Sequence, residues 1–201
     1  MDVKLYLTNV RELSGHLDKG LNLLTPRRRE ETTAFVEEKD RLLHLAAGLL
    51  LRNVLHVTRD EDLVYGEFDK PELADGRVHF SLSHAGYYAV LAVSEHPVGV
   101  DIEPIAKPQI LPRKMLTAEE MQWLEEHPSA EDFCLIWTRL ESALKAEGCG
   151  LALEQREFSL LSGGAPWYWD TLIYDGHLLT CAGLSPLAVQ TVILSVEQLL
   201  K

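Results

Sequence analysis

The sequence predicts an α+β fold, and three observations support that class. Apolar and polar residues alternate at residues 2–9 as in a strand, and strand-like runs return in the middle of the chain and near its end. Two longer stretches repeat their apolar residues at helical spacing. The strands do not alternate regularly with helices, which disfavours a doubly wound parallel sheet.

The first helical pattern runs from about residue 32 to residue 57. Arg41 and His44 lie near the edges of its apolar face. We expect that face to form core. Its residues are Leu42, Leu43, Leu45, Leu49, Leu50 and Val54.

The middle of the chain predicts an antiparallel meander. A charged loop at residues 67–77 leads into strands at residues 78–84 and 88–94, and a short link at residues 95–97 leads into a third strand at residues 98–103. Prolines then interrupt the pattern at Pro104, Pro108 and Pro112.

Two helices are expected after this break. Thr117 is placed to cap the first, because acidic residues fill the turn that follows it. The second should cover residues 130–147 and end at Gly148 and Gly150. The remaining strand-like runs lie at residues 167–174, 177–182 and 188–196.

Composition limits the function classes. The 201 residues are 46% apolar, which suffices to bury a core as one domain or two small ones. Nineteen Lys and Arg against thirty-one Asp and Glu give a formal net charge of −12, which argues against nucleic-acid binding. The three cysteines form no C-x-x-C pair, and no apolar run reaches bilayer-spanning length. We therefore expect a soluble, cytoplasmic protein without a signal peptide or membrane partner.

Asp101 and Glu103 form the first candidate site. Residues two apart on a strand project from the same face, so these carboxylates would meet. A divalent cation that prefers oxygen ligands, such as Mg²⁺, Mn²⁺ or Ca²⁺, would relieve their repulsion. The alternative is a strand end whose acids face water, which is the commoner setting for an isolated D-x-E pair.

Two further candidate groups lie on either side of that strand. Trp137, Glu141 and Lys145 are spaced by four residues and share one helix face. A surface ion pair beside a core tryptophan would explain the same spacing. Ser83 and His84 lie at the end of an expected strand, where their side chains could contact a phosphate. A lone histidine is more often a structural hydrogen-bonding residue.

Taken in this order, the segments resemble the 4'-phosphopantetheinyl transferases of the Sfp type. That family combines a Ser-His element, a G-[VI]-D-[IV]-E strand and a W-x-x-K-E-[AS]-x-x-K helix. The matching segments here are residues 83–84, 99–103 and 137–145. The resemblance spans about residues 27–185.

Two weaker elements also match, and two positions depart from the pattern. Lys70 and Pro71 resemble the end of a Gly-Lys-Pro element, and residues 148–151 resemble a Gly-x-Gly-[LI] stop. The glycine of the first element is Asp69 here, and the lysine before the helix glutamate is Leu140.

The resemblance implies two similar α/β halves related by a pseudo-twofold axis, with an active site in the cleft between them. The halves would be residues 1–104 and 105–201, and the chain would be a monomer. The implied activity is the transfer of the 4'-phosphopantetheine group of coenzyme A to a serine of an apo acyl or peptidyl carrier protein, releasing 3',5'-ADP.

The resemblance also implies roles for individual residues. Asp101, Glu103 and Glu141 would hold Mg²⁺, or Mn²⁺ in its place. Glu141 would also act as the base, and Lys145 would stabilise the phosphates and the leaving group. The remaining residues implied to bind coenzyme A are His84 at the pyrophosphate, Ser83 beside it in the sequence, Lys70 near the adenine and phosphate region, and Arg27, Arg28 and Arg41 at the 3'-phosphate.

A carrier protein of this kind is typically acidic, as this chain is, so overall attraction would not guide docking. Residues 110–116 offer apolar side chains beside two positive charges and could form a transient interface. Filling the core is an equally weighted alternative for them.

Two other classes stay open. Leu140 favours a protein that binds coenzyme A or a carrier without catalysis. An acidic structural domain in which the motifs are coincidental is the second alternative.

Overall fold

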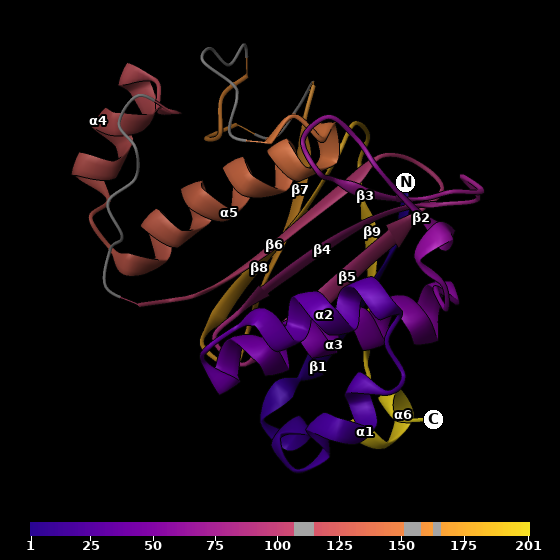
Figure 1. The fold of residues 1–201 in the computed structure, drawn as a ribbon. Helices are drawn as coiled ribbons and strands as arrows, with labels where there is room; N and C mark the ends of the chain where they lie inside the picture. The colour runs from indigo at the N-terminus through magenta and orange to yellow at the C-terminus, as the bar shows by residue number, and fades with distance from the viewer. Residues whose placement is uncertain (107–114, 151–157, 163–165) are drawn as a thin grey trace.

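The computed structural model describes residues 1–106, 115–150, 158–162 and 166–201. Over these residues the chain is α+β, with one mixed sheet and one antiparallel sheet, so the predicted class is confirmed. Figure 1 shows the long helices on either side of the central strands. Within the described ranges, no helix is both long and apolar enough to cross a bilayer.

The first sheet has four strands and includes segments from both ends of the chain. Strand β1 (Asp2–Asn9) pairs antiparallel with β5 (Tyr88–Ser94) and parallel with β9 (Ala188–Ile193). Strand β4 (His79–Ala85) pairs with the other side of β5. Alternate residues of β1 are buried, as the sequence pattern predicts: Val3, Leu5 and Leu7.

The predicted meander is wrong in its third strand. Strand β6 (Val98–Pro104) does not pair with β5 but opens a second sheet with β8 (His177–Gly183), which also pairs with β7 (Tyr168–Tyr174). The link before β6 contains Pro97, which has no N–H with which to close a hairpin. The hydroxyl of Ser94 instead accepts the backbone N–H of His96 at 3.3 Å.

The helical pattern predicted over residues 32–57 is two helices, α2 (Pro26–Ala34) and α3 (Glu38–Leu55). The backbone becomes extended at Phe35 and stays so at Glu37. Arg41 donates to the carbonyl of Val36 in this turn at 3.4 Å. Since the turn itself carries apolar residues, hydrophobic spacing did not separate the two helices.

Several short elements complete the fold. They are η1 (Val10–His16), α1 (Leu17–Leu21), η2 (Asp60–Asp62), β2 (Leu63–Tyr65), β3 (Pro71–Leu73) and α6 (Val196–Leu199). Two of them, β2 and β3, form a small antiparallel hairpin, and β3 lies within residues 67–77, which were predicted to be a loop.

The two predicted C-terminal helices are confirmed. Helix α4 (Ala118–Glu126) begins with a capping box, in which Thr117 and Glu120 exchange side-chain and backbone hydrogen bonds. Helix α5 (Ala130–Glu147) is capped by Ser129 and ends at Gly148, whose φ of 75° is left-handed.

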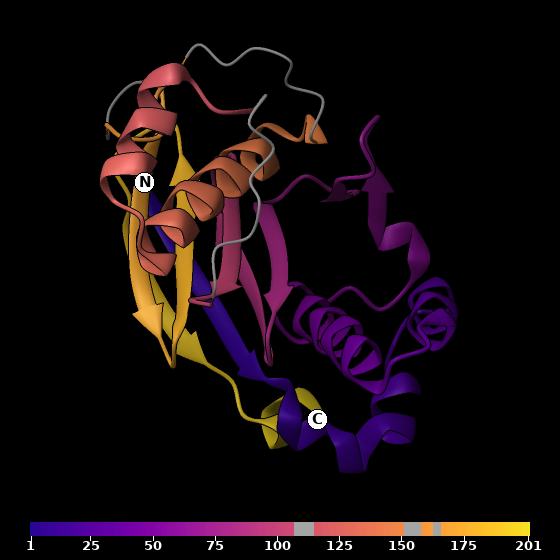
Figure 2. The same ribbon diagram turned by 90° about the vertical axis from the view of Figure 1, so that its left-hand side faces the viewer.

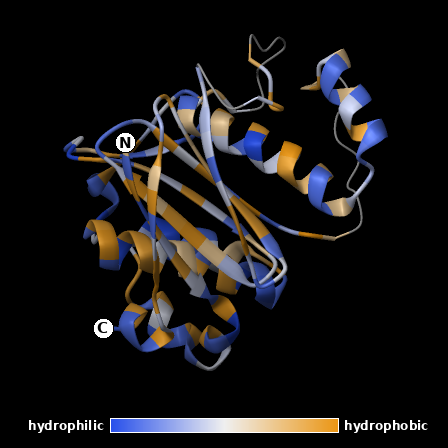
Figure 3. Ribbon diagram, turned by 180° about the vertical axis from the view of Figure 1, so that it is seen from behind, coloured by the Kyte–Doolittle hydropathy of each residue, from blue (hydrophilic) through white to orange (hydrophobic). Residues whose placement is uncertain are grey.

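The core is layered. One face of the first sheet packs against α3, and its other face packs against β6 and β8 of the second sheet. Helix α5 contacts β6 and β8. Figure 2 shows the two helical regions separated by strands, and Figure 3 shows apolar ribbon along the strands and a largely hydrophilic α4.

The two sheets meet where β4 lies beside β6. Here the hydroxyl of Ser81 accepts the backbone N–H of Val100 at 3.1 Å. On the α5 side, a Cβ added to Gly99 would overlap the carbonyl oxygen of Ser142 and stand 2.6 Å from the amide nitrogen of Ala146. Only glycine allows this approach of strand to helix.

We expect Gly99→Ala to lower the free energy of unfolding by about 3 kcal/mol, because α5 must move away from β6 to admit the methyl group. Urea unfolding followed by circular dichroism measures the loss. Gly15→Ala is the matched control, since a Cβ there meets nothing within 4 Å. Equal effects of the two substitutions would contradict the close packing.

Candidate active site

A cavity of about 480 Å³ opens where β4, β6 and α5 converge opposite α2 and α3. It brings together residues from all three candidate groups of the sequence analysis. Its walls are formed by Arg28, His44, Ala47, Pro71, Leu82, Ser83, His84, Asp101, Glu103, Trp137, Glu141 and Lys145.

Asp101 is the most enclosed charged group of this cavity, with only 2% of its surface exposed. The ammonium group of Lys145 lies 2.5 Å from its Oδ1, and the hydroxyl of Ser83 donates to the same oxygen at 2.8 Å. Lys145 also donates to Ser83 at 3.1 Å. The other carboxylate oxygen of Asp101, Oδ2, is buried without a hydrogen-bond partner.

Glu103 and Glu141 face the same cavity, but less positive charge compensates their carboxylates than compensates Asp101. Burial, followed by the charge of Asp101, raises the pKa of Glu103 to about 6, while the indole of Trp137 donates to it at 3.3 Å. Burial also raises the pKa of Glu141, and Lys145 opposes that shift. The prediction that Asp101 and Glu103 project from one face is confirmed, because Ile102 between them is fully buried in the core.

The donor set fits a divalent cation. Three carboxylates surround one cavity, one buried oxygen has no partner, and two of the acids lack enough positive charge to keep their ordinary pKa. The described residues do not already form a group of three that could hold a metal ion. Metal binding by Asp101, Glu103 and Glu141 therefore stays a prediction.

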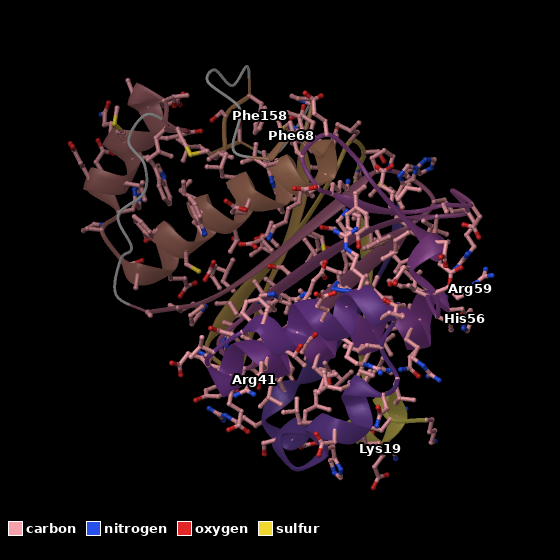
Figure 4. All side chains as sticks on the ribbon, viewed as in Figure 1. Lys19, Arg41, His56, Arg59, Phe68 and Phe158 are labelled. Atoms are coloured by element: carbon pink, nitrogen blue, oxygen red, sulfur yellow. The ribbon has the colours of Figure 1, made fainter. Side chains whose placement is uncertain are left out.

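Only one of the three arginines predicted to bind a phosphate lines this cavity. Arg28 does so beside His44. Arg27 instead bonds to Glu31 at 2.8 Å and covers the ring of Tyr65. Arg41 donates to the carbonyl of Val36 in the turn before α3 and lies at the lower left of the molecule in Figure 4.

A smaller cavity of about 280 Å³ adjoins the first and shares four of its residues. Lys70 lies here rather than in the larger cavity, and its ammonium donates to the carbonyl of Ala146 at 3.1 Å, near the end of α5. Figure 4 shows Phe68 beside the same helix end. The remaining walls are mostly apolar: Pro71, Phe80, Leu82 and Leu144, with Ser81, Glu141, Lys145, Gly148 and Gly150.

Leu140 does not face the cavity. It is fully buried in an apolar cluster with Met115, Ile136, Leu144 and Leu160. Its neighbour Arg139 also points away and donates to the carbonyl of Leu160 at 2.7 Å. The departure from the lysine pattern at this position is therefore accommodated by core packing.

Residues 110–116 were predicted either to form a transient interface or to fill the core. Of these, residues 110–114 lie outside the described residues, so only Met115 and Leu116 can be compared with that prediction. Met115 is buried and Leu116 packs against the same apolar cluster as Leu140. For these two residues the core alternative holds.

Sequence reasoning missed His44 as a cavity residue. The available signal was a histidine between Leu43 and Leu45 on an otherwise apolar helix face. The ring contacts Phe35, and burial together with Arg28 lowers its pKa to about 4. His44 is thus neutral near pH 7.

Comparisons with known proteins bear on the same residues. The sequence profile of the 4'-phosphopantetheinyl transferase superfamily matches residues 97–178, which contain β6 and α5. The chain is 32% identical over 133 residues to the 4'-phosphopantetheinyl transferase gsp of Aneurinibacillus migulanus, covering 62% of this chain and 56% of that protein. It therefore spans little more than half of this relative.

Two Bacillus subtilis proteins are similar over a longer stretch. The 4'-phosphopantetheinyl transferases ffp and Sfp are 29% and 28% identical over 154 residues. Each match covers 71% of this chain and 68% of the relative.

We expect Leu140→Lys to lower the free energy of unfolding by about 3 kcal/mol, because it would place an unpaired ammonium in apolar core. Leu140→Met keeps the volume and should cost less than about 1.5 kcal/mol. Chemical denaturation of both variants measures the difference. A fully stable lysine variant would show that position 140 reaches water.

We expect a pH-dependent stability difference between the wild type and Glu103→Gln in metal-free buffer. The folded-state pKa of Glu103 lies above its ordinary value of 4.5, at about 6, so the folded chain holds the proton more tightly and loses stability as pH rises through that range. After allowance for solvent screening of a partly exposed group, the glutamine variant should gain about 1 kcal/mol on the wild type between pH 4 and pH 7. Denaturation at several pH values tests this, and a constant difference would contradict it.

Proposed function

We propose that the chain is a 4'-phosphopantetheinyl transferase of the Sfp type, because it matches the superfamily profile over residues 97–178 and is similar to the curated transferases gsp and Sfp. It would transfer the phosphopantetheine arm of coenzyme A to a serine of an apo acyl or peptidyl carrier protein. This is the reaction of a holo-[acyl-carrier-protein] synthase, and it releases 3',5'-ADP. The observation that carries the proposal is the single cavity in which Asp101 and Glu103 of β6 meet Glu141 and Lys145 of α5.

The substrate would lie along the two adjoining cavities. Lys145 and His84 would contact the pyrophosphate, and Arg28 the 3'-phosphate, because these are cationic or hydrogen-bonding groups that line the larger cavity. The adenine would occupy the smaller, mostly apolar cavity beside Lys70.

Asp101, Glu103 and Glu141 would hold Mg²⁺, with Mn²⁺ as an alternative, because their ligand atoms are all oxygens. A divalent metal bound there supplies charge neutralisation and orientation at the pyrophosphate.

Two residues of the chain would handle the proton of the carrier serine and the charge of the leaving group. Glu141, whose pKa is raised by burial, would accept the proton of the carrier serine as that oxygen forms a bond to the β-phosphorus. The bond from this phosphorus to the oxygen that bridges to the α-phosphate breaks, and its electron pair leaves with 3',5'-ADP. Lys145 would stabilise the negative charge that develops on the leaving group.

The finer architecture belongs to the same proposal. We place the boundary between two pseudo-twofold halves at residue 104, supported by one 18-residue helix on each side of it, α3 and α5. Strand β9 from the second part nevertheless completes the sheet of the first. We further propose a cytoplasmic monomer that binds neither nucleic acid nor membrane. The net charge of −12 argues against nucleic-acid binding, and two halves in one chain favour a monomer.

The proposal predicts a mass gain of one phosphopantetheine when an apo carrier protein is incubated with this chain, coenzyme A and Mg²⁺. Intact-mass spectrometry measures the product. EDTA should prevent it, and Glu141→Gln should slow it by at least about 100-fold, because the base is lost. Glu131→Gln, an exposed change on the same helix, is the matched control.

Several carrier classes should be tried. Binding of coenzyme A without transfer to any carrier would select the alternative of a non-catalytic binding protein. Absence of both binding and transfer would overturn the proposal altogether.

A further inference from the structure

A closed ring of hydrogen bonds lies at the α2–α3 end of the larger cavity. The hydroxyl of Thr32 donates to the backbone carbonyl of Arg28 at 2.6 Å. The same hydroxyl oxygen lies 2.7 Å from Nδ1 of His44, and Nε2 of His44 lies 3.4 Å from Nη1 of Arg28. The ring thus begins and ends on Arg28.

Counting protons fixes the direction of every bond in this ring. Thr32 has one hydroxyl proton, which it gives to the carbonyl of Arg28. Nδ1 of His44 must therefore carry the proton that Thr32 accepts. A neutral imidazole protonated at Nδ1 has Nε2 free as an acceptor, and the guanidinium of Arg28 can donate to it.

The electrostatic setting keeps His44 in this neutral form. Burial is the largest cause of its lowered pKa of about 4, the charge of Arg28 adds to it, and Glu31 opposes it. The nearer carboxylate oxygen of Glu31 is 3.8 Å from Nε2, beyond hydrogen-bond distance, while its other oxygen bonds to Arg27. His84, which lines the same cavity, also disfavours the charged form of His44.

Arg28 itself retains unused hydrogen-bonding capacity. Its Nε is buried without a partner, and burial lowers the pKa of its guanidinium. Its stem passes close to α3, where a Cβ on Gly48 would come within 3.5 Å of its Cδ. An anion in the cavity beside Arg28 would compensate this buried positive charge.

We propose that Thr32 and His44 are positioning residues that aim Arg28 at the 3'-phosphate of coenzyme A, and that they thereby set the preference for coenzyme A over 3'-dephospho-coenzyme A. The inference rests on the proposed function. Thr32 is fully buried and is not among the residues that line the cavity, so its effect must pass through His44 and Arg28.

The test compares the affinities of coenzyme A and 3'-dephospho-coenzyme A by titration calorimetry, because their ratio isolates the 3'-phosphate. The wild type should prefer coenzyme A by about tenfold or more, as expected for a charge-assisted hydrogen bond, and Arg28→Gln should remove the preference. Thr32→Val keeps the shape but deletes the hydroxyl, and should reduce the ratio by about fivefold. Thr32→Ser should restore it.

A double-mutant cycle separates positioning from general structure. In the Arg28→Gln background, Thr32→Val should leave the ratio unchanged, because there is no guanidinium left to aim. A Thr32→Val variant that weakens both ligands equally would reduce Thr32 to a structural role and overturn the inference. A wild type that binds both ligands equally would overturn the inference, and with it the contact of Arg28 with the 3'-phosphate, while leaving the proposed transfer reaction intact. Binding of neither ligand would count against both the inference and the transfer reaction.

The tautomer of His44 gives a second measurement that needs no variant. Long-range proton–nitrogen NMR of the wild type should show the neutral ring protonated at Nδ1 near pH 7. Protonation at Nε2 would break the ring of hydrogen bonds and overturn the inference.

Discussion

The close approach of β6 to α5 is the constraint on which the candidate site depends. Gly99 leaves no space for a side chain, so the backbone of β6 lies against α5 around Ser142. Asp101 follows two residues later on the strand and Lys145 three residues later on the helix, and their charged atoms meet at 2.5 Å. A buried glycine weakens a strand on its own. Here it determines how near the charged groups of the two elements can come.

The cavity holds its charges in an unequal balance. Lys145 and Ser83 compensate one oxygen of Asp101, whereas Glu103 and Glu141 keep raised pKa values because burial outweighs the positive charge near them. A carboxylate removed from water without a cation is costly. Under the proposed function, a divalent ion would correct this imbalance and lower both pKa values.

Local patterns were enough to predict some elements and not others. Helix α5 was predicted over about residues 130–147 from its apolar spacing and the glycines that follow it, and the structure gives these bounds, with Gly148 left-handed at the end. The break between α2 and α3 was missed because the turn itself carries apolar residues. The departure of β6 from the first sheet was missed because its pairing with β8 is a long-range contact. The same limit applies to the site. Arg27 and Arg28 are neighbours in the sequence, yet only the burial of Arg28 against α3 brings it into the cavity.

The position of the cations explains how an acidic chain could hold a polyanion. Arg28 from α2 and Lys145 from α5 line the same cavity, and His84 from β4 lines it as well. Charges farther than about 8 Å away are largely screened at physiological salt. Phosphates in the cavity would therefore respond to these groups rather than to the net charge of −12. A ligand that contacts both Arg28 and Lys145 would link α2 to α5, so its binding would also stabilise the packing of these two parts of the chain.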